Sequence, residues 1–96
     1  MTRAEFEADL RREGYEVNEG EIKPDTHRQP HAHDFDARIL VLDGRFSVQY
    51  ERERVDYNPG DMCAVPAGTT HAEHTEADGV RYVFGRRAAA RPAAER

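Results

Sequence analysis

The sequence predicts an all-β protein, a closed antiparallel barrel or sandwich with one short α-helix at its N-terminal end. Six or seven short apolar segments follow one another between residues 15 and 84, separated by turns rich in glycine and proline. Short strands at such close spacing are typical of small barrels and sandwiches. We therefore expect a helix at residues 1–14, a β domain at 15–85 and a flexible tail at 86–96 that lacks large apolar residues.

The helix prediction rests on a capping pattern. Thr2 and Glu5 are three residues apart, the spacing at which each side chain accepts a hydrogen bond from the other residue's backbone N–H at a helix start. A helix from about Arg3 to Glu13 is expected to follow. Phe6 and Leu10 are four residues apart and share one face of it. We expect this helix to cap one end of the β domain.

The first strand is expected to precede a segment bracketed by prolines. Tyr15 and Val17 alternate with polar residues up to position 22, as in an edge strand with one solvated face. Pro24 and Pro30 each lack a backbone donor and push the preceding residue towards extended geometry. The segment between them is therefore expected to be a loop or an irregular strand.

Clearer strand signals follow. Residues 38–42, RILVL, are almost continuously apolar, as expected of a strand covered on both faces. Asp43-Gly44 is a strong signal for a two-residue hairpin, with Phe46, Val48 and Tyr50 alternating on the return strand. After the charged turn at 51–54, the remaining strands are expected at residues 55–57, 61–65, 70–75 and 80–84.

Composition excludes several classes of partner. The chain has 14 basic and 19 acidic residues and a net charge of −5, with both signs mixed along it, which disfavours nucleic acid and anionic membranes. Cys63 is the single cysteine, so no intramolecular disulfide is possible. No apolar run approaches the ~20 residues of a membrane span, and we expect a cytoplasmic protein. Because only 38% of residues are hydrophobic, a homodimer is also expected.

Three histidines are the strongest candidates for a functional site. His31 and His33 are two residues apart, a spacing that on a strand sends both imidazoles to one face. Neutral imidazole is the commonest transition-metal ligand in proteins. The third, His71, ends the stretch GDMCAVPAGTTH at residues 60–71, in which two glycines and a proline permit tight turns just before the histidine.

These motifs resemble those of the cupin superfamily. Its first motif is a glycine, five residues, H-x-H, three or four residues, a glutamate, six residues and a glycine; His31, His33 and Gly44 match it. Its second motif is a glycine, five residues, P-x-G, two residues, a histidine, three residues and an asparagine; the matches are Gly60, Pro66, Gly68 and His71. The resemblance implies a small jelly-roll barrel in which His31, His33 and His71 bind a divalent metal at its mouth.

Two departures from this pattern matter for the chemistry of the site. Ala37 stands where the first motif has its glutamate, and Thr75 stands where the second has its asparagine. Two carboxylates could replace the missing ligand. Glu73 has the strand parity of His71, so we favour it as a fourth ligand or a nearby acid/base group, with a solvated carboxylate as the alternative. Asp36 has the opposite parity and would need a β-bulge to turn inward.

Other residues are given less specific roles. His74 is three residues from His71 and is expected to face away from it, on the surface or at an interface. His27 is expected at the rim of the site. Cys63 is expected to be a buried structural thiol, and Arg38, beside the missing glutamate, is a speculative anion-binding group. The imidazole set suits Fe, Ni, Zn or Cu without choosing among them.

Three kinds of function remain open. Three-histidine cupins are often thiol or diketone dioxygenases, so the resemblance allows a metal-dependent oxygenase, or a related enzyme, acting on a small polar organic molecule. Cupin barrels also serve as small-ligand sensors without chemistry, and the missing glutamate could indicate such a binding module. A purely structural dimerisation barrel is supported only by the apolar segment 38–42.

Overall fold

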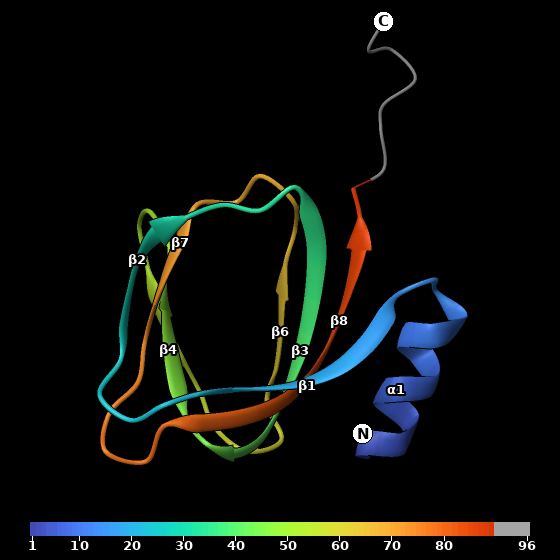
Figure 1. Ribbon diagram of the computed structural model, residues 1–96, viewed down its shortest axis with the longest axis horizontal. Helices are drawn as coiled ribbons and strands as arrows, with labels where there is room; N and C mark the ends of the chain where they lie inside the picture. Colours follow the sequence, from blue (N-terminus) through green and yellow to red (C-terminus); the bar gives the residue numbers. More distant parts are fainter. Residues whose placement is uncertain (90–96) are drawn as a thin grey trace, which may run out of the picture.

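The computed structural model describes residues 1–89, which form one helix and eight strands (Figure 1). In chain order these are α1 (Arg3–Arg12), β1 (Glu16–Ile22), β2 (His27–His31), β3 (Phe35–Gly44), β4 (Phe46–Gln49), β5 (Arg54–Tyr57), β6 (Met62–Val65), β7 (His71–His74) and β8 (Val80–Ala88). The all-β prediction with one N-terminal helix is confirmed.

Two four-stranded antiparallel sheets face one another. One has the order β1-β8-β3-β6 and the other the order β2-β7-β4-β5. Apart from the paired strands β4 and β5, successive strands pass from one sheet to the other, as in a jelly roll, and Figure 1 shows the sheets as opposite walls of a barrel. The expected edge strand near residues 15–22 is β1, which lies at the edge of its sheet.

Two apolar clusters hold the fold together. The larger cluster fills the space between the sheets and includes Ile39 and Val41. The smaller one lies on the outer face of the β1-β8-β3-β6 sheet, where Phe6 and Leu10 of α1 pack against Leu40 and Val83. Residues 38–42 contribute to both clusters, which confirms that this strand is covered on both faces.

The helix begins as the sequence predicts. Thr2 Oγ1 accepts a hydrogen bond from Glu5 N at 3.1 Å, and Thr2 N donates to Glu5 Oε1 at 2.8 Å. The capping box is therefore complete. The helix ends at Arg12, one residue before the expected end. α1 covers the outer face of a sheet, so the expectation that it caps one end of the β domain is wrong.

The hairpin predicted at Asp43-Gly44 is wrong. β3 pairs with β8 and β6, whereas β4 pairs with β5 and β7 in the other sheet. The two-residue signal correctly marks a reversal of the chain, but the chain crosses between sheets there. Local turn chemistry fixes the conformation of two residues and does not determine which strands pair.

Gly44 is required at this crossing for two reasons. Its φ is +74°, a left-handed conformation that other residues adopt at a cost. A Cβ at this position would also lie 2.2 Å from the carbonyl oxygen of Gly79. The two backbones therefore approach more closely than any side chain would allow.

The strand predicted at 80–84 is longer than expected. β8 continues to Ala88, which pairs with Phe35, so β3 and β8 form a long central ladder. Residues 86–88, expected to belong to a flexible tail, are therefore part of a strand, and residues 90–96 of that tail lie outside the described part of the chain. No helix within residues 1–89 is long and apolar enough to cross a membrane.

Gly44→Ala should destabilise the fold more than Gly60→Ala does. Both glycines have positive φ, so each substitution should cost about 1–2 kcal/mol of backbone strain. A Cβ at Gly60 meets open space, whereas one at Gly44 collides with backbone, which should add at least about 1 kcal/mol. Chemical denaturation of both variants measures the difference, and equal costs would contradict the proposed close approach.

Candidate metal centre

The three predicted histidines lie together at one end of the barrel. Ring centroids are 4.5 Å apart for His31 and His71, 4.8 Å for His31 and His33, and 5.6 Å for His33 and His71. One ligand atom from each ring lies within 4.8 Å of the other two. His71 is the most buried, with 2% of its surface exposed, while His31 is half-buried.

Strand pairing and a loop contact bring the rings together. His31 and His71 are direct cross-strand partners on β2 and β7. His33 follows β2 and lies in the loop before β3, so strand parity alone does not explain its orientation. The loop is fixed because Gly68 N donates to His33 O at 2.9 Å. The turn that delivers His71 therefore also positions His33.

Two backbone carbonyls fix the tautomers of His31 and His71. The Nδ1 atom of His71 lies 2.9 Å from Thr69 O, and that of His31 lies 2.7 Å from Gln29 O. A carbonyl oxygen only accepts, so each Nδ1 carries the proton and donates it. Nε2 of both rings is then left with a lone pair, as metal-ligating histidines require.

The donor set fits a divalent transition metal. Imidazole nitrogens bind such ions at about 2.0–2.1 Å, so two nitrogens on one ion are at most about 4.2 Å apart. The ligand atoms of the three rings, all within 4.8 Å of one another, lie close to that range. Burial and the neighbouring His31 and His71 hold the pKa of His33 below its ordinary value, which keeps the ring neutral and able to bind a metal.

The position of the missing glutamate faces this site. Ala37 has the strand parity of Ile39 and Val41, whose side chains lie in the inner core. Asp36, the alternative that required a bulge, instead accepts a hydrogen bond from Ala67 N at 2.8 Å. It therefore supports the turn before His71 and supplies no ligand atom to the three-histidine group.

Glu73 faces the barrel interior, as its parity predicts. Its side chain is 11% exposed, and its Oε2 lies 3.7 Å from Nε2 of His71. Its other oxygen, Oε1, accepts a hydrogen bond from Arg28 Nη1 at 3.1 Å. Among residues 1–89, the group of donor atoms within 4.8 Å of one another holds the three histidines and no carboxylate. Glu73 thus lies beside the group rather than within it.

Sequence reasoning missed Arg28 because β2 is irregular. Arg28 pairs with Glu73 and His31 with His71, with a register shift between the two pairs. Three residues on β2 thus span two on β7, which brings Arg28 to the inner face together with His31. Pro30, which cannot donate a backbone hydrogen bond, lies within this irregular segment.

The same irregularity places His27 on the outer face. It pairs with His74, and the two ring centroids are 5.3 Å apart. The outward orientation predicted for His74 is confirmed. His27, expected at the rim of the metal site, lies on the opposite side of the sheet from it. Neither residue belongs to the three-histidine group.

Cys63 and Arg38, the remaining candidates, contact other parts of the fold and lie outside the three-histidine group. Cys63 is buried, as predicted, and its sulfur lies 3.8 Å from the Tyr50 hydroxyl. Burial raises the pKa of Cys63, Tyr50 and Tyr57, so all three stay protonated at neutral pH. Arg38, considered for anion binding, points to the outer face, where its guanidinium lies 5.6 Å from the centroid of the Phe6 ring.

Comparison with known proteins identifies the family. A family model described as the cupin domain matches residues 18–84 of the sequence, which is most of the chain. The protein belongs to the cupin family. Comparison with curated proteins gives no match.

Solved structures share the fold of this cupin. A protein of unknown function from Rhizobium leguminosarum is 22% identical with a TM-score of 0.73, over 92% of this chain and 94% of that one. KdgF from Halomonas sp. is 28% identical with a TM-score of 0.59, and the match covers 74% of this chain and 67% of that one. A chain from a study of the DMSP lyases RdDddP and RnDddQII is 24% identical with a TM-score of 0.71, and the match covers 78% of this cupin and 39% of that chain. We take these likenesses as evidence of fold alone.

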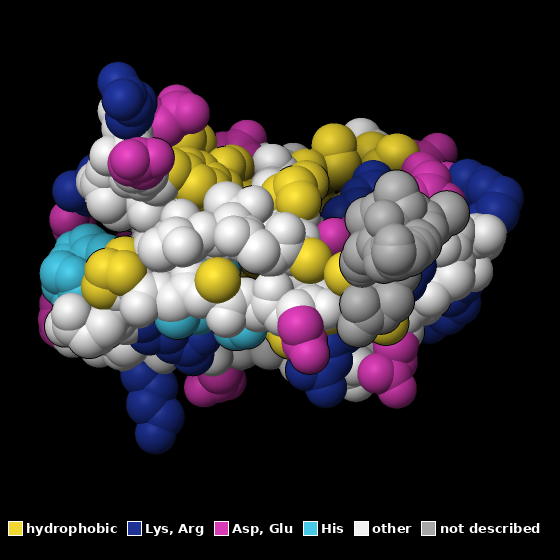
Figure 2. All heavy atoms as spheres, turned by 90° about the horizontal axis from the view of Figure 1, so that it is seen from above, with side chains coloured by type: hydrophobic (Ala, Val, Ile, Leu, Met, Phe, Trp, Pro, Cys, Tyr) yellow, Lys and Arg dark blue, Asp and Glu magenta, His cyan; other side chains and the backbone are white. Residues whose placement is uncertain are grey.

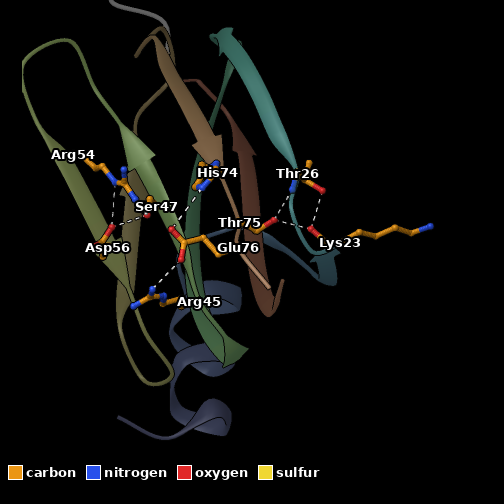
Figure 3. Close-up of polar contacts among 9 residues, drawn as sticks. All are labelled: Lys23, Thr26, Arg45, Ser47, Arg54, Asp56, His74, Thr75 and Glu76. Carbon is orange, nitrogen blue, oxygen red and sulfur yellow. Dashed lines mark hydrogen bonds and ion pairs between the residues drawn. The ribbon is translucent and has the colours of Figure 1, made fainter. Parts of the chain in front are cut away.

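Hydrogen bonds of Thr75 join the end of the second cupin motif to the start of the first. We call this set of contacts the clamp. Thr75 is buried, its hydroxyl donates to Lys23 O at 2.6 Å, and it accepts from Thr26 N at 3.0 Å (Figure 3). Asp25 stands at the position of the first motif's glycine and has a φ of +53°. Asp tolerates this conformation better than most residues. The clamp therefore fixes the turn that starts β2.

A hollow in this cupin includes one member of the three-histidine group, His71. It has a volume of about 480 Å³ and is bounded by β2, β4 and β7 through Pro30, Gln49, Tyr50, Glu51, Thr70, His71 and Ala72. A space of this size is within the range of small-molecule pockets. Figure 2 shows basic and acidic side chains interspersed on the face it displays, with neither sign gathered into one broad patch.

Thr75→Val should destabilise this cupin by about 1–3 kcal/mol, because it leaves Thr26 N without its side-chain acceptor and removes one of the two hydroxyls that donate to Lys23 O. Thr70→Val is the matched control, since Thr70 is exposed. We expect its free energy of unfolding to stay within about 0.5 kcal/mol of wild type. Urea denaturation measures both; a Thr75→Val variant as stable as the control would show that the clamp is dispensable.

Proposed function

We propose that this cupin binds one divalent transition metal through His31, His33 and His71 and acts on a small polar organic molecule as a metal-dependent oxygenase or a related enzyme. The observation that carries the proposal is the convergence of three imidazoles, two of them with Nε2 left free by backbone contacts. Fe, Ni, Zn and Cu all suit such a donor set.

The chain's own residues would supply most of the environment. A divalent ion held by three neutral imidazoles supplies a Lewis acid with open coordination positions. Glu73, beside His71, can hold or release a proton or serve as a fourth ligand. The hollow next to His71 offers space for a small molecule, and Tyr50 on its wall keeps its hydroxyl proton because burial raises its pKa.

A second candidate function is a non-catalytic small-ligand sensor. Ala37 faces the site where the family motif has a glutamate, so the three-histidine group has no carboxylate of its own. Such a site can retain affinity for a ligand without turning it over.

We also propose that the protein is cytoplasmic and forms a homodimer. In support of the dimer, Met62 on the edge strand β6 leaves 49% of its surface exposed.

Protein purified without a histidine tag should bind close to one equivalent of transition metal, as measured by elemental analysis. His71→Ala should reduce this below one tenth of an equivalent, because the buried ligand is lost. His74→Ala is the matched control on the same strand and should retain the metal, since His74 faces the opposite side. Metal content that is negligible in wild type, or equally reduced by both substitutions, would refute the three-histidine site.

Turnover separates the two candidate functions. Metal-loaded protein is mixed with a panel of small thiols, keto acids, diketones and sugars, and both oxygen consumption and product formation are measured. We expect at least one compound to be converted, with conversion lost in His71→Ala. Compounds that raise the melting temperature without being converted would favour the sensor.

A further inference from the structure

Arg28 occupies an unusual place for an arginine, on the inner face of the barrel next to the proposed metal site. It lies on β2 opposite Glu73, and the ion pair between them is 3.1 Å long. Its side chain is 46% exposed, whereas that of Glu73 is 11% exposed. The guanidinium therefore has one side on a buried carboxylate and another within reach of a molecule entering from solvent.

Most of the donors of Arg28 remain available. A guanidinium has five N–H donors arranged to grip a carboxylate with two parallel hydrogen bonds. Within residues 1–89, Glu73 is the one carboxylate paired with Arg28, and a single nitrogen, Nη1, makes that contact. Tyr82 lies close enough for the Arg28 guanidinium to oppose the rise in its phenol pKa that burial causes.

The balance of charge around the site favours an anion. His31, His33 and His71 bring no negative charge when neutral, the negative charge of Glu73 is matched by Arg28, and Asp34 adds one negative charge near His33. A divalent cation at the histidines would leave an excess of positive charge in a partly buried space, which an anionic ligand would offset.

We propose that Arg28 binds the carboxylate of a small organic acid, so that the ligand class of this cupin is carboxylate-bearing rather than neutral. The inference rests on the proposed function, because it assumes that the three-histidine site holds the rest of the ligand. Glu73 supports the choice of a carboxylate, since Arg28 already pairs with one from its own chain.

The test compares lactate with lactamide on the zinc-loaded full-length chain by isothermal titration calorimetry. The two compounds share a hydroxyl and differ in the carboxylate. We expect lactate to bind at least tenfold more tightly than lactamide. Arg28→Gln should weaken lactate binding at least tenfold and leave lactamide binding unchanged, with Arg28→Lys intermediate.

Two further variants separate recognition from a structural role. Arg45→Gln removes the same charge from an exposed arginine that pairs with Glu76 at 3.2 Å (Figure 3) and should leave lactate binding unchanged. Glu73→Gln should tighten lactate binding, because it frees Arg28 from the carboxylate that competes with the ligand. If the Arg28–Glu73 pair served only to hold the barrel together, Glu73→Gln would weaken lactate binding as well.

Zinc content and melting temperature are measured for every variant, so that failure of the metal site is distinguished from failure of the carboxylate site. An Arg28→Gln protein that is folded, holds zinc and binds lactate as wild type does would overturn the proposal. So would zinc-loaded wild type that binds none of lactate, pyruvate and malonate. Wild type that holds no zinc would instead refute the proposed function, and with it the assumption behind this inference.

Discussion

The hydrogen bond from Gly68 N to His33 O, 2.9 Å long, is the contact on which the candidate site depends most. It joins the turn between β6 and β7 to the loop between β2 and β3, so two segments more than thirty residues apart are held in one arrangement. Asp36 strengthens the same junction by accepting from Ala67 N. Without this junction His33, which is not held in a strand, would have no fixed position relative to the cross-strand pair His31 and His71.

The barrel and the site place different demands on the chain. Apolar residues between the sheets and beneath α1 stabilise the fold, and these clusters have no histidine among them. The site is built instead from polar side chains with specific partners, namely carbonyls for the two Nδ1 atoms and Arg28 for Glu73. The substitution of Ala at position 37 can therefore change the chemistry of the site without weakening the core.

Local signals predicted most of the elements and the three histidines. The capping box, the apolar run at 38–42 and the spacing of Gly60, Pro66, Gly68 and His71 each act over a few neighbouring residues, so they can be recognised in the sequence. Features that depend on pairing between distant strands were missed. The Asp43-Gly44 turn crosses between sheets because β3 finds its partners in β6 and β8, and Arg28 turns inward only through the irregular pairing of β2 with β7.

Anomalous diffraction from crystals of the zinc-loaded protein tests the central claim most directly, because it locates the ion independently of any activity. The account predicts one peak about 2.0–2.1 Å from Nε2 of His31, Nε2 of His71 and one ring nitrogen of His33. Nδ1 of His31 and of His71 should remain hydrogen-bonded to the carbonyls of Gln29 and Thr69. A peak at the outer His27–His74 pair instead, or no ordered peak in the barrel, would contradict the account.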